Sequence, residues 1–198
     1  MKSYIEKEAD VLVVGGGLAG LWAAIRATDY ARKVVLIEKG KVSRSGVSVF
    51  CHTTSGPAPA NQYGDWFKEH VERSTFLANQ PLLEIFLKEN GDRIKEMISW
   101  GVEFERNSDG SLKTEAVRGQ KVTRSALYTG KLMMEKMRGE ALRRGVVLEE
   151  RVMVTDLLTS DGKLPTKGSI VGAVGLNTRT GEFVVYHTGG VVLATGPM

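Results

Sequence analysis

Cysteine and histidine are scarce in this 198-residue chain. The single cysteine, Cys51, excludes an internal disulfide framework and a cysteine-ligated iron–sulfur cluster. The three histidines, His52, His70 and His187, are far apart and lack the spacing of metal ligands, so we predict no metal site. A chain that needs no disulfide fits a reducing compartment, and we expect a cytoplasmic protein.

The chain also lacks a hydrophobic run long enough to cross a membrane. Residues 11–25 are nearly uncharged, but they fall short of the roughly 20 residues that a spanning helix needs. Three consecutive glycines interrupt this segment. The preceding Glu6, Glu8 and Asp10 have the wrong sign for a signal peptide. We therefore expect neither a transmembrane segment nor a signal peptide.

Charge of one sign is not concentrated anywhere in the sequence. The formal net charge is +4, with 27 Lys and Arg scattered among 23 Asp and Glu. No basic block suggests nucleic acid as a partner. The hydrophobic fraction of 42% supports a real core, and the length is enough for one domain, or one and part of another.

One motif near the N-terminus points to a function. An apolar run at residues 11–14 leads into Gly-Gly-Gly-Leu-Ala-Gly at residues 15–20 and then into an alanine-rich helical stretch. A second apolar run, residues 34–37, ends at Glu38. The order strand, glycine turn, helix, strand and acid predicts a dinucleotide-binding βαβ unit.

Each residue type in this unit has a physical role. Gly15 permits the tight turn, Gly17 lets a diphosphate approach the backbone, and Gly20 lets the helix pack closely on the strand. The helix N-terminus offers N–H groups and a partial positive charge to the diphosphate. Glu38 can accept hydrogen bonds from the ribose hydroxyls. The alternative is a glycine turn in some other α/β domain, but the position of the acid favours the nucleotide.

The middle of the chain predicts a long connection followed by helices. Residues 40–64 leave the end of the second strand, where ligands bind in open α/β sheets. A solvated loop is the alternative for any one of its residues. Helices are predicted over residues 65–100 and from Gly130 to Arg144. Apolar residues expected to face inward are Phe67, Val71 and Phe76 in the first helix and Leu132, Met133, Met137, Ala141 and Leu142 in the last.

The last fifty residues predict mainly strands. Val146–Leu148 reads as a short strand of the parallel sheet. Three alternating runs, Arg151–Leu158, Ser169–Leu176 and Glu182–His187, read as a β-meander. Residues 189–196 then give a separate buried strand that ends in Ala-Thr-Gly at the mouth of the cofactor cleft.

Together these motifs resemble the FAD-binding domain of glutathione-reductase-like flavoproteins. The chain most resembles the succinate dehydrogenase/fumarate reductase flavoprotein family, which includes L-aspartate oxidase and the adenylylsulfate reductase flavoprotein. The resemblance implies an α/β fold: a Rossmann-like FAD-binding domain with a parallel sheet, a β-meander and inserted helices. It covers residues 1–198 as the N-terminal portion of that domain, without the family's capping domain and C-terminal region. The resemblance therefore leads us to expect a fragment, an isolated domain or one piece of a split flavoprotein.

The resemblance also implies the residues that contact FAD. They are Gly15, Gly17, Leu18, Ala19, Gly20, Glu38, Lys39, Arg44, Ser45, Gly46, Val152, Ala194, Thr195 and Gly196. Ser43 is likewise placed to meet the dinucleotide. Members with covalent flavin carry a histidine directly after the Arg-Ser pair, whereas this chain has Gly46, as in the adenylylsulfate reductase flavoprotein. We therefore expect noncovalent FAD, and we assign no catalytic residue.

The implied function is that of an FAD-dependent oxidoreductase. It would transfer electrons between a small carboxylate substrate and FAD. Its partner would be an iron–sulfur electron-transfer subunit, and partner subunits would attach it peripherally to a membrane. One alternative is an adenylylsulfate-reductase-like enzyme. Another is a non-catalytic flavin- or nucleotide-binding module of a split complex. NAD ranks lower as the cofactor, because a plain NAD domain would not carry the meander and the closing Ala-Thr-Gly strand.

Overall fold

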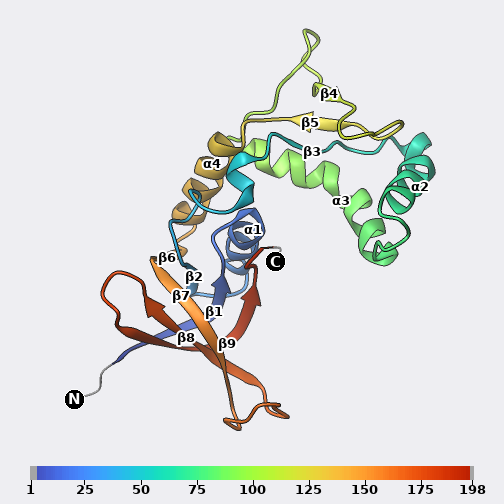
Figure 1. Cartoon of the computed structure of the whole chain (residues 1–198). Helices are drawn as coiled ribbons and strands as arrows, with labels where there is room; N and C mark the ends of the chain where they lie inside the picture. The colour runs from blue at the N-terminus through green and yellow to red at the C-terminus, as the bar shows by residue number, and fades with distance from the viewer. Residues whose placement is uncertain (1–3, 197–198) are drawn as a thin grey trace. The chain divides into compact units, whose positions relative to one another are not determined.

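A six-stranded sheet forms the centre of one unit of the protein, made of residues 1–49 and 134–198. The computed structural model describes residues 4–196 and gives the strand order β6-β2-β1-β9-β8-β7 (Figure 1). Strands β6, β2, β1 and β9 run parallel, whereas β7, β8 and β9 form an antiparallel meander. The bounds are β1 Tyr4–Val14, β2 Val34–Glu38, β6 Val147–Glu150, β7 Val152–Thr159, β8 Ile170–Asn177 and β9 Phe183–Leu193. The predicted α/β class is confirmed.

Apolar side chains on β1 and β2 explain the core of this unit. Every residue of β2 is buried, as expected for a strand covered on both faces. On one face of the sheet, Leu12 and Val35 pack in a buried cluster with Val184 and Tyr186 of the meander. Helix α1, Leu18–Ala27, lies against β1, β2 and β9 and buries Leu21, Ala24 and Ile25.

The prediction of two separate strands before the C-terminus is wrong. Strand β9 is continuous, because β1 begins at Tyr4 and pairs in one register from Tyr4↔Phe183 to Val14↔Leu193. The end of β9 was predicted to be buried, but Val192 and Leu193 are 39% and 59% exposed. Strand β8 pairs with β9 only up to His187, so within residues 4–196 the second half of β9 has a strand on one side only.

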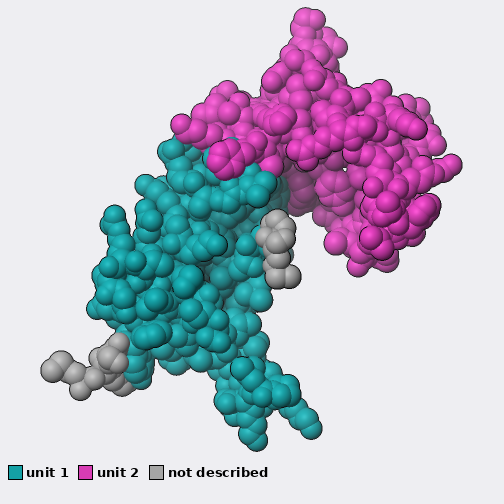
Figure 2. Space-filling view, viewed as in Figure 1, with its two compact units in different colours: residues 1–49, 134–198 teal, residues 50–133 magenta. Residues whose placement is uncertain are grey.

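The second unit, residues 50–133, is coloured magenta in Figure 2. It contains two helices and a small antiparallel sheet. The sheet order is β3-β5-β4. The elements of this unit are β3 Thr53–Ser55, the short 3-10 helix η2 Ala60–Gln62, α2 Tyr63–Arg73, α3 Gln80–Ser99, β4 Thr114–Glu115 and β5 Ser125–Leu127. The short 3-10 helix η1, Val47–Phe50, spans the boundary between the two units along the chain. Asn79 caps α3 by accepting from the N–H of Leu82 at 3.1 Å, and Gly101 follows its end at φ +87°.

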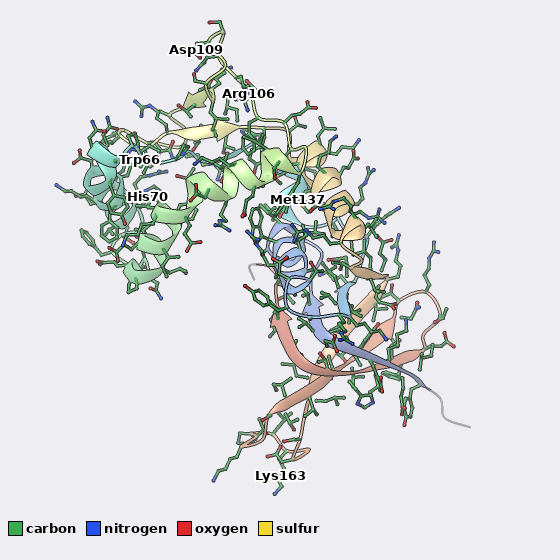
Figure 3. All side chains as sticks on the ribbon, turned by 180° about the vertical axis from the view of Figure 1, so that it is seen from behind. Trp66, His70, Arg106, Asp109, Met137 and Lys163 are labelled. Atoms are coloured by element: carbon green, nitrogen blue, oxygen red, sulfur yellow. The ribbon has the colours of Figure 1, made fainter. Side chains whose placement is uncertain are left out.

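Some residues predicted to face a core are exposed. Phe76 does not belong to α2, which ends at Arg73; it has φ +64° and is 71% exposed. Helix α4, Gly130–Arg143, contains the boundary between the two units. Met133, Met137 and Ala141 of α4 are buried as predicted, and Met134 is buried with them (Met137 is labelled in Figure 3). Leu132 and Leu142 are about half exposed, because the buried stripe of α4 runs through Met133 and Met134 instead.

Residues 117–124, which we call the braced loop, are held by a buried carboxylate. Glu69 of α2 is 8% exposed and accepts hydrogen bonds from the N–H groups of Lys121, Val122 (3.2 Å) and Thr123 (2.6 Å). On its own, burial would raise the pKa of Glu69, but the N–H groups of Thr123, Lys121 and Val122 outweigh burial and lower it to about 2. The carboxylate therefore binds this loop in its charged form.

We expect the contact between Glu69 and the braced loop to make the free energy of unfolding depend on pH. A carboxyl whose pKa is lowered in the folded state stabilises the fold when the pH is above its ordinary pKa of 4.5. This contribution is lost as the pH falls toward the folded-state pKa of about 2. The free energy of unfolding, measured by denaturant titration, should therefore fall between about pH 5 and pH 2. Glu69→Gln should flatten that dependence, whereas Glu72→Gln on the exposed side of α2 should leave it. Equal slopes for the parent and Glu69→Gln would contradict this role.

No helix among residues 4–196 has both the length and the apolar character needed to cross a membrane. The predicted domain bounds, 1–198, extend past the described residues at both ends and stay a prediction.

Candidate cofactor-binding site

The glycine turn between β1 and α1 is tightly packed. Gly15 has φ +113°, and a Cβ there would lie closer than 3.0 Å to the carbonyl of Ala194. A Cβ on Gly20 would also lie closer than 3.0 Å to the carbonyl of Gly15. These two positions therefore need glycine: one for its backbone angle and its approach to β9, the other for helix packing.

Gly17 is different, because the space beside it is open. A Cβ on Gly17 would meet only the hydroxyl of Ser48, at 3.5 Å. Gly17 is the N-cap of α1 and supplies no side-chain hydrogen bond. Leu18, the first residue of the helix, donates its N–H to Ser48 Oγ at 3.2 Å, and Ala19 follows it. An anion at this helix end would meet Ser48 as well as the backbone.

Glu38 lies at the end of β2 and is 8% exposed. Its Oε2 accepts the N–H of Gly16 at 2.7 Å, and its Oε1 accepts the N–H of Gly40 at 2.8 Å and the hydroxyl of Ser45 at 3.0 Å. The carboxylate thus joins the glycine turn to the start of the next loop. Its four lone-pair sites leave room for a further donor such as a ribose hydroxyl.

A cavity of about 220 Å³ lies at the carboxyl ends of β1 and β2. Five of the predicted residues line it: Gly15, Glu38, Lys39, Val152 and Thr195. Val14 and Ile37 of the strands and Met153 and Val154 of β7 complete the lining. The site combines apolar walls with one carboxylate and one exposed lysine, which suits a nucleoside with hydroxyl groups.

The closing strand and the long connection supply the other predicted residues. Ala194 donates its N–H to the carbonyl of Val14 at 2.8 Å, and Gly196 has φ +85°. Arg44 does not line the cavity and forms an ion pair with Glu135 at 2.8 Å. Gly46 has φ +78° with open space around it.

Sequence reasoning did not reveal several contacts of the site. Ser43, expected to meet the dinucleotide, is 1% exposed, and its N–H donates to the carbonyl of Gly16 at 3.3 Å. Ser48 stands at the helix N-terminus without any motif to mark it. Met153 and Val154 could have been found from Val152, since they continue its strand. Across residues 4–196, no three His, Cys, Asp or Glu side chains are grouped as metal ligands.

Comparison with known proteins places the chain in a family. The family model described as FAD binding domain matches residues 10–198. One subunit of the fumarate reductase (CoM/CoB) of Methanothermobacter marburgensis is 27% identical, over 96% of this chain and 35% of the relative. L-aspartate oxidase of Streptomyces coelicolor is 30% identical, over 96% of this chain and 33% of the relative.

Solved structures of flavoproteins are also similar to this chain. The quinol fumarate reductase of Escherichia coli has a TM-score of 0.85 at 26% identity, over 97% of this chain and 33% of that one. Adenylylsulfate reductase of Archaeoglobus fulgidus has a TM-score of 0.74 at 25% identity, over 96% of this chain and 30% of that one. The chain belongs to the FAD-binding-domain family, and FAD is its cofactor. It spans about a third of the length of these relatives.

Proposed function

We propose that the cavity beside Glu38 holds the adenosine of FAD and that the N-terminus of α1 holds the diphosphate. Glu38 would bind the ribose hydroxyls, and Lys39, Val152 and Thr195 would border the same nucleoside. Gly17, Leu18 and Ala19 would meet the diphosphate through the backbone. The observation that carries this proposal is the cavity itself, because its lining gathers, from four segments distant in sequence, residues that the family resemblance implied.

The remaining predicted contacts complete the same proposal. Gly15 and Gly20 shape the turn, and Ala194 and Gly196 border the cofactor from the end of β9. Arg44 and Gly46 would approach the flavin half, Arg44 after leaving Glu135. Ser45 would stay beside the adenosine, where its hydroxyl donates to Glu38 at 3.0 Å. Bound FAD supplies the electron-accepting chemistry, which the protein directs by orientation and charge.

For the whole protein we propose an FAD-dependent oxidoreductase related to succinate dehydrogenase and fumarate reductase. It would exchange electrons between a small carboxylate and FAD and pass them to an iron–sulfur partner. The names of the relatives support this reading, although the chain spans only about a third of them. A cytoplasmic location with peripheral membrane attachment through partner subunits belongs to the same proposal.

Adenylylsulfate-reductase-like chemistry is the second candidate. It is favoured by Gly46 after Arg44-Ser45 and by the similarity to the Archaeoglobus fulgidus enzyme. Assays of the complete protein with succinate, fumarate and adenylylsulfate distinguish the two candidates. Inactivity on all three, with FAD bound, would favour a non-catalytic flavin-binding module.

We expect FAD to be held without a covalent bond, because Gly46 offers no side chain for flavin attachment. Acid denaturation of the FAD-loaded protein, followed by separation of polypeptide from small molecules, should release all flavin. NAD titrated against the same protein is the control for cofactor choice and should bind more weakly. Flavin that remains on the polypeptide would disprove noncovalent binding, and His52 would then be the first residue to replace.

A further inference from the structure

Arg44 lies in the connection between β2 and η1, at a point that both of its neighbours fix. Ser43 is 1% exposed and donates its N–H to the carbonyl of Gly16, in the glycine turn, at 3.3 Å. On the other side, the hydroxyl of Ser45 donates to Oε1 of Glu38 at 3.0 Å. Arg44 therefore lies between one contact with the turn that leads into α1 and one contact with the carboxylate that lines the cavity.

The backbone at Arg44 is held by the fold, whereas its side chain is not. Ser43 has φ +65°, an uncommon angle for a residue with a side chain, and such angles persist only where the surroundings impose them. The N–H of Arg44 donates to the carbonyl of Lys41 at 3.0 Å, which closes a turn. The long side chain of Arg44 can still rotate toward different partners from this fixed backbone.

In the structure the side chain of Arg44 is bound to an acid of α4. Its Nη2 lies 2.8 Å from Oε1 of Glu135, and the two side chains are 49% and 38% exposed. Both residues belong to the same unit of the protein. Ion pairs as exposed as this one are weak, so a stronger anion can displace Glu135. Gly46, two residues further on, has φ +78° and open space around it, which leaves room for a ligand next to the connection.

We propose that Glu135 is an autoinhibitory partner of Arg44, which holds the guanidinium in the FAD-free protein and releases it when FAD binds. The inference rests on the proposed function, in which Arg44 approaches the flavin half. That half of FAD bears a phosphate, and an arginine binds phosphate with two parallel hydrogen bonds. Glu135 and the phosphate therefore compete for one cation. The apparent affinity for FAD is then lower than the intrinsic affinity by the fraction of molecules in which Glu135 has released Arg44.

Glu135→Gln tests this competition, because it removes the charge and keeps the size and the helix propensity of the side chain. FAD affinity, measured by flavin fluorescence, should rise about two- to fivefold, the range that the strength of exposed ion pairs allows. Arg44→Gln should lower FAD affinity about tenfold. In the double variant, Glu135→Gln should have no further effect, since the cation that Glu135 withholds is absent.

Glu150→Gln is the matched control. Glu150 also contacts the connection, because its Oε1 accepts the N–H of Val42 at 3.2 Å, but its ion pair is with Arg138, at 3.6 Å. This variant removes the same charge as Glu135→Gln and should leave FAD affinity unchanged. A rise equal to that of Glu135→Gln would show a general effect of charge on an anionic ligand and would overturn the proposal.

Three further results would contradict the competition. An unchanged affinity in Glu135→Gln would show that Glu135 withholds nothing, and a lower affinity would show that it positions Arg44 for FAD instead. An unchanged affinity in Arg44→Gln would show that Arg44 does not meet FAD. A rise that persists in the double variant would show that Glu135 acts without Arg44. Glu38→Ala tests the adenosine site by itself, so failure of this inference is distinct from failure of the proposed function.

Discussion

Replacement of Gly20 by alanine is expected to abolish FAD binding and to destabilise the fold. The added Cβ would lie closer than 3.0 Å to both the carbonyl carbon and oxygen of Gly15, which are backbone atoms. These atoms cannot move aside, because the N–H of Gly15 donates a hydrogen bond to the carbonyl of Ile37 at 2.8 Å and Gly15 lies against Ala194. Overpacking of this kind costs about 1–3 kcal/mol, and relief of the clash would push α1 away from the diphosphate.

The measurement is a denaturant titration together with FAD binding by flavin fluorescence. Gly139→Ala is the matched control, since Gly139 lies in α4 with open space around it and alanine favours a helix by about 1 kcal/mol. It should be neutral or stabilising. A Gly20→Ala protein with the parent's unfolding free energy and affinity for FAD would contradict the packing at this turn.

The βαβ unit could be predicted from the sequence because its determinants are local. The glycine spacing, the apolar runs and Glu38 lie within 28 residues, residues 11–38, and each has one structural meaning in that order. The meander could be predicted for the same reason, since alternation and turn residues act over short distances. The structure adds that glycine is also required at position 15 because its backbone lies against Ala194, the residue that follows β9, and no local pattern reveals this contact.

Other features depend on partners distant in sequence. The continuity of β9 is imposed by pairing with β1, about 179 positions away in register, although Gly189 and Gly190 suggested a break. Glu69 reads as one more acid on a helix surface, and only the approach of residues 121–123 turns it into a buried anion. Ser48 likewise gains its contact with Leu18 through the path of the long connection.

Replacement of Glu38 by alanine is the sharpest test of where the cofactor lies. Loss of a carboxylate that accepts hydrogen bonds from ribose hydroxyls should weaken FAD binding by roughly 1.5–3 kcal/mol, about ten- to a hundredfold. The variant also frees the N–H groups of Gly16 and Gly40, so some stability should be lost with it. Affinity must therefore be measured at a temperature where the variant is shown to be folded.

Controls separate the effect on the ligand from the effect on the loop. Ser45→Ala removes one internal donor to Glu38 but keeps the carboxylate, so it should change FAD affinity less than Glu38→Ala. Glu150 lies beside Glu38 on the neighbouring parallel strand β6 and does not line the cavity. Glu150→Gln should therefore leave FAD affinity unchanged. Gly17→Ala should narrow the space for the diphosphate while its Cβ meets only the hydroxyl of Ser48, so it should lower affinity with little loss of stability. A folded Glu38→Ala protein that binds FAD as tightly as the parent would show that the adenosine does not lie in the cavity beside Glu38. The carboxylate would then serve only to hold the glycine turn and the following loop.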